Sequence, residues 1–262
     1  MNLPAGILRD EVVVITGVGA GLGAKLAQRA VAEGAKVVMA ARSGNVTEQI
    51  EKDTDGAAVA VACDVRKEED CARVIDTAIE RFGKVTGLVN SAYAHPGFHD
   101  LLETPDKGLR RSMDVILHGS LQMTRLAVPH MKAGGGGSIV NVGTMTTRKP
   151  MKGEGGYAVA KAAMTCATQF LALELGEHNI RVNQAIMGWL DGPGVRFYLT
   201  MTSEQKGITE QDVYDDIAAR NPLGRIPTDE ACAGAILMLL SGYTSEVTGA
   251  ILDVNGGEYM PA

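Results

Sequence analysis

Short apolar runs alternate with longer amphipathic segments along almost the whole chain. A continuous apolar run such as Val12–Thr16 is typical of a strand that is covered on both faces of a sheet. The segment 67–82 instead places its apolar residues on one helical face, which predicts an amphipathic helix. By these patterns we predict strands over 12–16, 36–41, 57–63, 85–90, 138–143, 180–186 and 250–254. We predict helices over 21–34, 67–82, 109–132, 157–177 and 228–241.

The repeated order of strand and helix predicts a parallel sheet with right-handed crossovers and helices on both faces. No linker interrupts the pattern, so we predict an α/β fold, a single Rossmann-type doubly wound domain over 1–262 with a seven-stranded parallel sheet. The segment 187–227 is irregular and too long for a plain connection. Such segments are usually functional lids or disordered, and we interpret this one as a substrate loop.

The composition is that of an ordinary soluble globule, with 45% hydrophobic and 21% charged residues. The net charge is −6 and no long basic run occurs, so we expect no nucleic-acid partner, because phosphate binding needs clustered Lys or Arg. No apolar stretch approaches the ~20 residues of a membrane helix, and the N-terminus has no signal-peptide pattern. The four Cys fit no zinc motif, so we expect reduced thiols, no metal and a cytoplasmic protein.

A glycine-rich turn over 16–23 (TGVGAGLG) follows the first strand and opens the first helix. Glycines there let the backbone approach a pyrophosphate, and the helix N-terminus offers N–H groups and a positive dipole. We therefore predict a dinucleotide site with contacts from Gly17, Gly21, Leu22 and Gly23. The alternatives are a GxGxxA register over 19–24 and a glycine-rich turn that binds nothing.

The end of the second strand bears on the choice of cofactor. An acidic residue there would bind a ribose hydroxyl, but this chain has Ala41, followed by Arg42 and Ser43. Arg forms charge-assisted hydrogen bonds with phosphate, so we predict NADP(H) in preference to NAD(H). The alternative is that Arg42 stacks on adenine or faces water.

Tyr157 and Lys161 lie four residues apart near a predicted helix start, and so on one helical face. A nearby ammonium lowers the pKa of a phenol, which would make Tyr157 an acid or base near neutral pH. Thr144 comes 13 residues earlier, at the end of the fifth strand. We predict Tyr157 and Lys161 to be catalytic.

The turn over 16–23, the YxxxK pair over 157–161 and the segment 180–188 (IRVNQAIMG) resemble the short-chain dehydrogenase/reductase family. The resemblance extends to PLGR, VTG and VNGG near the C-terminus and covers essentially the whole chain. It implies an oxidoreductase that moves hydride between nicotinamide C4 and the carbon of a carbonyl or secondary alcohol. It implies that Tyr157 exchanges a proton with the substrate oxygen and that Lys161 holds the nicotinamide ribose. It also implies that Thr144 is catalytic, because it takes the place of a serine that positions the substrate oxygen.

The resemblance further implies cofactor contacts from Asp64, Val65, Asn90, Ala92 and Gly188, with Asp64 on the adenine amino group. A helix N-cap is an equally weighted alternative for Asp64, because the residues after it are predicted to be helical. The family also implies a homotetramer in which the helices over 109–132 and 157–177 pack across a two-fold axis.

Four positions depart from the family pattern. Tyr93 and Met187 replace a glycine and a proline, and Ala20 stands where NADP-binding members carry a basic residue. Ile116 replaces an asparagine that helps to hold a proton-relaying water, although its backbone carbonyl could still bind water. These departures keep an alternative open, in which the chain binds NAD(P) as a sensor or scaffold.

Aromatic and Met residues gather in the segments that line the family's substrate pocket, which predicts a hydrophobic small-molecule substrate. The equally weighted alternative is that they pack the loop on the core or on another subunit. His95 is either a second proton donor or, more commonly for a loop histidine, without a catalytic role. The predicted wall comprises Tyr93, His95, Phe98, Met145, Met151, Trp189, Phe197, Tyr198 and Met201.

Overall fold

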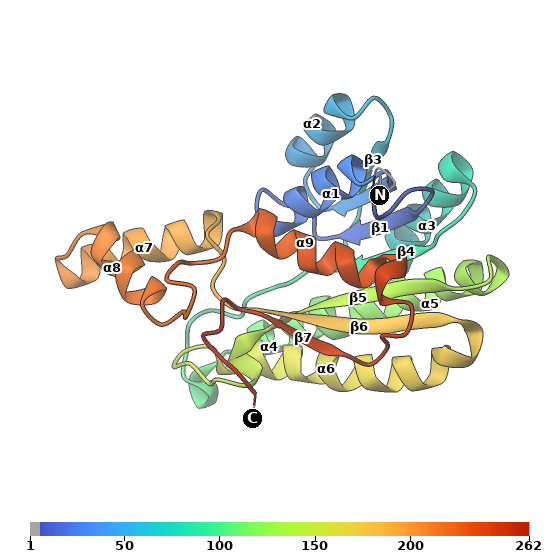
Figure 1. Cartoon of the computed structure of the whole chain (residues 1–262). Coiled ribbons are helices and arrows are strands. Elements are labelled where there is room, and N and C mark those ends of the chain that lie inside the picture. The colour runs from blue at the N-terminus through green and yellow to red at the C-terminus, as the bar shows by residue number, and fades with distance from the viewer. Residues whose placement is uncertain (1–5, 262) are drawn as a thin grey trace.

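A computed structural model describes residues 6–261 and contains one seven-stranded parallel sheet in the order β3-β2-β1-β4-β5-β6-β7 (Figure 1). The strand order reverses between β1 and β4, so a crevice opens at their carboxyl ends. The predicted fold is confirmed, and every strand lies within two residues of its prediction. The strands are β1 Val12–Thr16, β2 Lys36–Ala41, β3 Ala58–Ala62, β4 Gly87–Asn90, β5 Gly137–Thr144, β6 Ile180–Met187 and β7 Ile251–Val254.

Helices cover both faces of the sheet (Figure 1). On one face lie α1 (Leu22–Ala32), α2 (Asn45–Asp53) and α9 (Asp229–Leu240), and on the other lie α3 (Glu68–Phe82), α5 (Gly119–Ala133) and α6 (Gly155–Leu175). Alternate residues of β1 enter the two cores, since Val13 and Ile15 pack toward α1 while Val12 and Val14 pack toward α3. The continuous apolar run therefore reports a strand buried on both sides. The sequence patterns did not predict α2, which buries only Thr47 and Ile50.

The helix predicted over 109–132 is one long helical stretch that changes its winding. It comprises α4 (Asp106–Met113), a π-helical turn (Asp114–His118) and α5. Gly119 follows the π turn, and a Cβ there would lie 2.6 Å from Val65 Cγ2. Close packing against the 63–67 loop thus requires glycine at this point. Hydropathy alone does not distinguish a π turn from an α-helix.

The interpretation of 187–227 as an irregular loop is wrong. The segment contains α7 (Pro193–Lys206) and α8 (Glu210–Ala218), which project beyond the carboxyl edge of the sheet (Figure 1). A small apolar core holds the two helices together, formed by Val195, Leu199, Val213, Ile217, Ala218 and Ile226. Glycines and a proline at 192–194 resemble a turn, although proline also suits the first position of a helix. Within 6–261, no helix has the length and apolar character needed to cross a bilayer.

Candidate active site

A cavity of about 550 Å³ lies at the carboxyl edge of the sheet, between the glycine-rich turn, the end of β5, the start of α6 and the segment leading into α7. It brings together residues that are distant in sequence. The predicted site residues that line it are Gly17, Gly21, Leu22, Gly23, Thr144, Tyr157, Lys161 and Gly188.

The turn after β1 is held against the end of β4. Gly17 has a positive φ of 73°, and a Cβ on it would lie 2.6 Å from Ala92 Cα. Thr16 Oγ1 accepts hydrogen bonds from the backbone N–H groups of Ser91 and Ala92, at 3.1 and 3.3 Å. By contrast, a Cβ on Gly19 would meet nothing within 4 Å, so this part of the turn faces open space.

The N-terminus of α1 fits a dinucleotide. Gly21 caps the helix without a side chain, and the first turn contains no acidic residue. The positive end of the helix dipole and the free backbone N–H groups therefore face the cavity. No side chain of the turn caps these N–H groups in place of a ligand. The observation favours a bound pyrophosphate at this position.

Lys161 is 2% exposed and its Nζ donates a 2.5 Å hydrogen bond to the Val142 carbonyl. Burial lowers the pKa of this ammonium to about 8. Nζ lies 5.7 Å from the centre of the Tyr157 ring. Burial raises the pKa of Tyr157, and Tyr93 and Glu154 raise it further. The expectation of a lowered phenol pKa is thus wrong for the protein alone, because burial disfavours the charged phenolate.

Thr144 ends β5 with its hydroxyl at the cavity. Its Oγ1 lies 3.2 Å from Thr146 Oγ1 and accepts a hydrogen bond from the Thr146 backbone N–H at 3.4 Å. Thr144, Tyr157 and Lys161 therefore share one cavity, as the helical spacing of the last two and the family resemblance of the first led us to expect. Thr146 was not predicted, because no motif distinguishes it from the neighbouring threonines.

Aromatic rings from the segment after β4 pack on Tyr157. The Tyr93 and His95 ring centres lie 6.3 and 5.2 Å from that of Tyr157, and Phe98 lies 4.5 Å from His95. The residue that replaces the family's glycine thus stands beside Tyr157. Glu154 was not predicted, yet its Oε2 lies 3.1 Å from His95 Nε2.

Most of the predicted substrate wall lines the cavity, including Trp189 and Tyr198, whose ring centres are 4.9 Å apart. The prediction is wrong for Phe197 and Met201, which are 63% and 43% exposed. Their spacing of four residues places both on the outer face of α7. Only the helical structure of this segment separates inward from outward residues.

Ile116 lies in the π turn and is 1% exposed, packed with Ala160 and Met164. Its carbonyl accepts a hydrogen bond from Ser120 Oγ at 2.7 Å. Where the family has a polar side chain near the lysine, this chain therefore has an apolar one.

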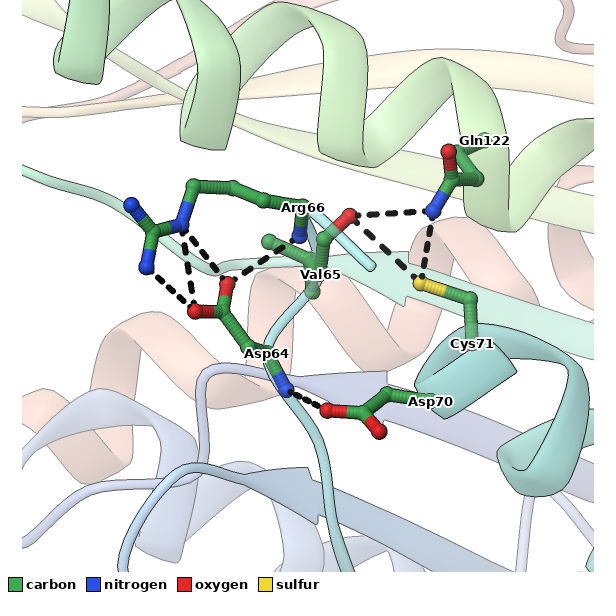
Figure 2. Close-up of polar contacts among 6 residues, drawn as sticks. All are labelled: Asp64, Val65, Arg66, Asp70, Cys71 and Gln122. Atoms are coloured by element: carbon green, nitrogen blue, oxygen red, sulfur yellow. Dashed lines mark hydrogen bonds and ion pairs between the residues drawn. The ribbon is translucent and has the colours of Figure 1, made fainter. Parts of the chain in front are cut away.

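The 63–67 loop forms a separate polar cluster (Figure 2). The Asp64 carboxylate accepts hydrogen bonds from the Arg66 guanidinium and backbone N–H, which lower the pKa of Asp64 to about 2. Lys67, not Asp64, is the N-cap of α3, so the capping alternative for Asp64 is wrong. Asp64 and Val65 line a second cavity of about 340 Å³.

The remaining predicted cofactor residues lie outside both cavity linings. Arg42 and Ser43 are exposed at the end of β2, and the positive charge of Arg42 contributes to the lowered pKa of Asp64. Asn90 is buried, and its Nδ2 donates to Asn141 Oδ1 at 2.9 Å. The Asn90 side-chain N–H group is therefore engaged within the sheet, and its Oδ1 is buried without a partner among the described residues.

Asp229 was not predicted and lines the main cavity in the first turn of α9. A Cβ on Gly21 would lie 3.2 Å from Asp229 Oδ2. Burial raises the pKa of Asp229, and Asp191 raises it further. The only sequence pattern near Asp229 is the threonine at 228, which is typical of a helix N-cap. That pattern predicts the start of a helix and does not predict a binding residue.

Comparison with known proteins gives a consistent result. A family model described as enoyl-(acyl carrier protein) reductase matches residues 17–258. Dehydrogenase/reductase SDR family member 4 of Bos taurus is 32% identical over 95% of this chain and 88% of its own length. L-fucose dehydrogenase of Oryctolagus cuniculus is 31% identical over 94% of this chain and 84% of its own length. 7alpha-hydroxysteroid dehydrogenase of Escherichia coli (strain K12) is 30% identical over 95% of this chain and 94% of its own length. The structure of a short-chain type dehydrogenase/reductase from Mycobacterium ulcerans matches with a TM-score of 0.85 at 28% identity, covering 96% and 90% of the two chains.

Proposed function

Because this chain belongs to the short-chain dehydrogenase/reductase family of oxidoreductases, we propose that it is an NAD(P)-dependent enzyme that interconverts a carbonyl and a secondary alcohol. The observation that carries the proposal is the single cavity that joins the glycine-rich turn to Thr144, Tyr157 and Lys161. A dinucleotide at the turn and a small molecule beside Tyr157 would both fit within this arrangement.

In this proposal the phenol of Tyr157 gives its proton to a carbonyl oxygen, or takes one from an alcohol. The hydroxyl of Thr144, a residue that is 9% exposed at the end of β5, orients that oxygen by a hydrogen bond. The Lys161 ammonium, anchored on the Val142 carbonyl, holds the ribose next to the phenol. A bound nicotinamide dinucleotide would supply or accept the hydride.

NADP(H) is the proposed cofactor in preference to NAD(H). Ala41 offers no carboxylate to a ribose hydroxyl, whereas Arg42 and Ser43 are exposed at the same strand end. Gly17, Gly21, Leu22 and Gly23 would bind the pyrophosphate, with Gly188 across the cavity. Asp64, Val65, Ala92 and the Asn90 backbone would contact the adenosine half.

The proposed substrate is hydrophobic, because Tyr93, Phe98, Met145, Met151 and Trp189 line the cavity around Tyr157. One relative is named for a polar sugar and another for an apolar steroid. Their names therefore do not decide between a polar and a hydrophobic substrate for this chain.

Replacing Tyr157 with Phe tests the function directly. We expect turnover on a panel of carbonyls to fall by at least about 10³-fold, because the proton donor is lost. Cofactor binding, measured by quenching of nicotinamide fluorescence, should change little. Tyr243→Phe, at a 64% exposed tyrosine, is the matched control. Near-full activity of the Tyr157 variant would rule out the assigned acid, and cofactor binding without turnover by the unmodified protein would favour the sensor or scaffold.

The proposal extends to the whole protein. We propose one domain over 1–262 with 187–227 as a substrate lid, a cytoplasmic location, and a homotetramer. All four cysteines are free thiols in the structure, which suits a reducing compartment. The tetramer is supported by large apolar side chains exposed on α6, among them Phe170 and Leu173.

A further inference from the structure

Glu154 is the N-cap residue of α6, three positions before Tyr157, and it lines the cavity. Its Oε2 lies 3.1 Å from His95 Nε2, and His95 Nδ1 accepts the Gly97 backbone N–H at 3.1 Å. Since Nδ1 is an acceptor, we assign the proton to Nε2, which donates it to Glu154. The imidazole thus holds the carboxylate of the residue that caps the helix of Tyr157.

The imidazole also packs directly on the phenol. The His95 and Tyr157 rings are 5.2 Å apart at an interplanar angle of 35°. Both partners of the pair are mostly shielded, with side-chain exposures of 23% for His95 and 16% for Glu154. Electrostatic effects between such groups are screened less than at an open surface.

The other charged groups around Tyr157 are few in the described chain. Lys161 opposes Glu154 from the next turn of α6, with its Nζ 5.7 Å from the phenol ring centre. Lys152 lines the cavity but its side chain is 89% exposed, and Asp229 lines the part by the glycine-rich turn. Tyr93 is a further titratable neighbour, and Tyr198 lines the same cavity.

The π turn contributes apolar neighbours on this side. Met113, at the end of α4, and Leu117 pack in the same cluster as Tyr157, and Ile116 lies there fully buried. Burial in these surroundings lowers the pKa of Lys161 to about 8. A smaller fraction of Lys161 therefore carries the positive charge that would stabilise the phenolate. A carboxylate near a phenol disfavours the phenolate, since like charges repel.

We propose that Glu154, held in place by His95, is a positioning residue that raises the pH at which Tyr157 loses its proton and so extends carbonyl reduction to higher pH. The proposal rests on the role given to Tyr157 above. In that direction the phenol O–H bond breaks as its proton passes to the carbonyl oxygen. The carbonyl carbon takes the hydride from the reduced dinucleotide, and the phenolate then takes a proton from water.

The test is an ultraviolet titration of phenolate formation, which requires no turnover. Each protein is compared with the same protein carrying Tyr157→Phe, so that the difference isolates Tyr157. In Glu154→Gln the phenolate should appear at a pH about one unit lower than in the unmodified protein. Glu154→Asp should restore most of the shift, and Glu174→Gln, at an exposed glutamate of the same helix, should have no effect. His95→Phe keeps a ring on Tyr157 but frees Glu154, and should give part of the shift.

The kinetic readout has a matching sign. Reduction needs the phenol, so its rate falls as Tyr157 ionises, and oxidation needs the phenolate, so its rate rises. In Glu154→Gln we expect both changes of rate at lower pH than in the unmodified protein. Coinciding titrations for the unmodified protein, Glu154→Gln and His95→Phe would overturn the proposal, as would an unmoved kinetic profile. If the titration shifts but no substrate is turned over, the proposed function fails while the effect of Glu154 on the proton stands.

Discussion

At the scale of single residues, Arg42 decides the cofactor in the proposed function. It is exposed at the end of β2, and its charge acts on Asp64. Replacing Arg42 with Leu should weaken NADPH binding by about tenfold or more, because a charge-assisted hydrogen bond contributes ~1.5–3 kcal/mol. NADH binding should change by less than about twofold, since it lacks the 2′-phosphate.

Isothermal titration with each nucleotide measures both effects. Arg73→Leu is the matched control, because Arg73 pairs with Asp70 and is 52% exposed. Equal losses for NADPH and NADH would contradict a 2′-phosphate contact.

Asp229 makes a residue-scale prediction about pH. Its pKa in the folded protein is raised, first by burial. Its contribution to folding stability is therefore fully present at a pH below the ordinary Asp pKa and is lost as the pH rises through the raised pKa. Asp229→Asn should therefore melt at a higher temperature than the unmodified protein at pH ~7 and at the same temperature near pH ~3. Thermal melting across this range provides the measurement.

Asp212 provides a control of opposite sign. It accepts hydrogen bonds from Thr209 in the capping box of α8, which lower its pKa. Asp212→Asn should thus lose stability at neutral pH, and the loss should vanish as the pH falls through the lowered pKa. If Asp229→Asn is no more stable than the unmodified protein at neutral pH, the raised pKa is wrong.

At the scale of elements, Arg181 on β6 holds the C-terminal end of α9. Its guanidinium donates to the carbonyls of Leu239 at 2.9 Å, Leu240 and Ser241, both at 3.2 Å, Val247 at 3.3 Å, and to Thr244 Oγ1 at 3.1 Å. These acceptors include the last carbonyls of a helix, which have no partners within it.

Arg181→Met should remove all five hydrogen bonds and leave the buried Leu240 carbonyl without its side-chain donor, whereas the Leu239, Ser241 and Val247 carbonyls keep other donors. We expect a loss of about 2–3 kcal/mol, which lowers the melting temperature by roughly 5–10 °C. Arg125→Met, at an exposed position on α5, should change it little. Similar melting temperatures for the two variants would contradict the capping role.

At the scale of the whole molecule, α6 carries an apolar outer face that the described chain does not cover. Val159, Phe170 and Leu173 are 45%, 59% and 79% exposed. Apolar side chains exposed together mark an association surface. Replacing Phe170 and Leu173 with Glu should at least halve the mass measured by light scattering, whereas Leu223→Glu, at a 58% exposed leucine, should leave it unchanged. A monomeric unmodified protein would contradict the proposed tetramer.

The sequence by itself determined the strands, most helices and the general position of the site. Strands buried on both faces are continuous apolar runs, so hydropathy suffices to find them, as for β1 and β2. Glycine is required at 17 and 23 because other backbone atoms approach closely there. Tyr157 and Lys161 are four residues apart, so a helix places them on the same face. Each of these signals lies within a short window of the chain.

Only the tertiary structure decided which distant residues meet. The pairing of His95 with Glu154 joins positions 59 apart in sequence, and Asp229 reaches Gly21 from the far end of the chain. The π turn before Gly119 and the inward faces of α7 and α8 likewise depend on packing between elements. Such contacts follow from how helices and strands are placed in space, which the pattern of a single segment does not encode.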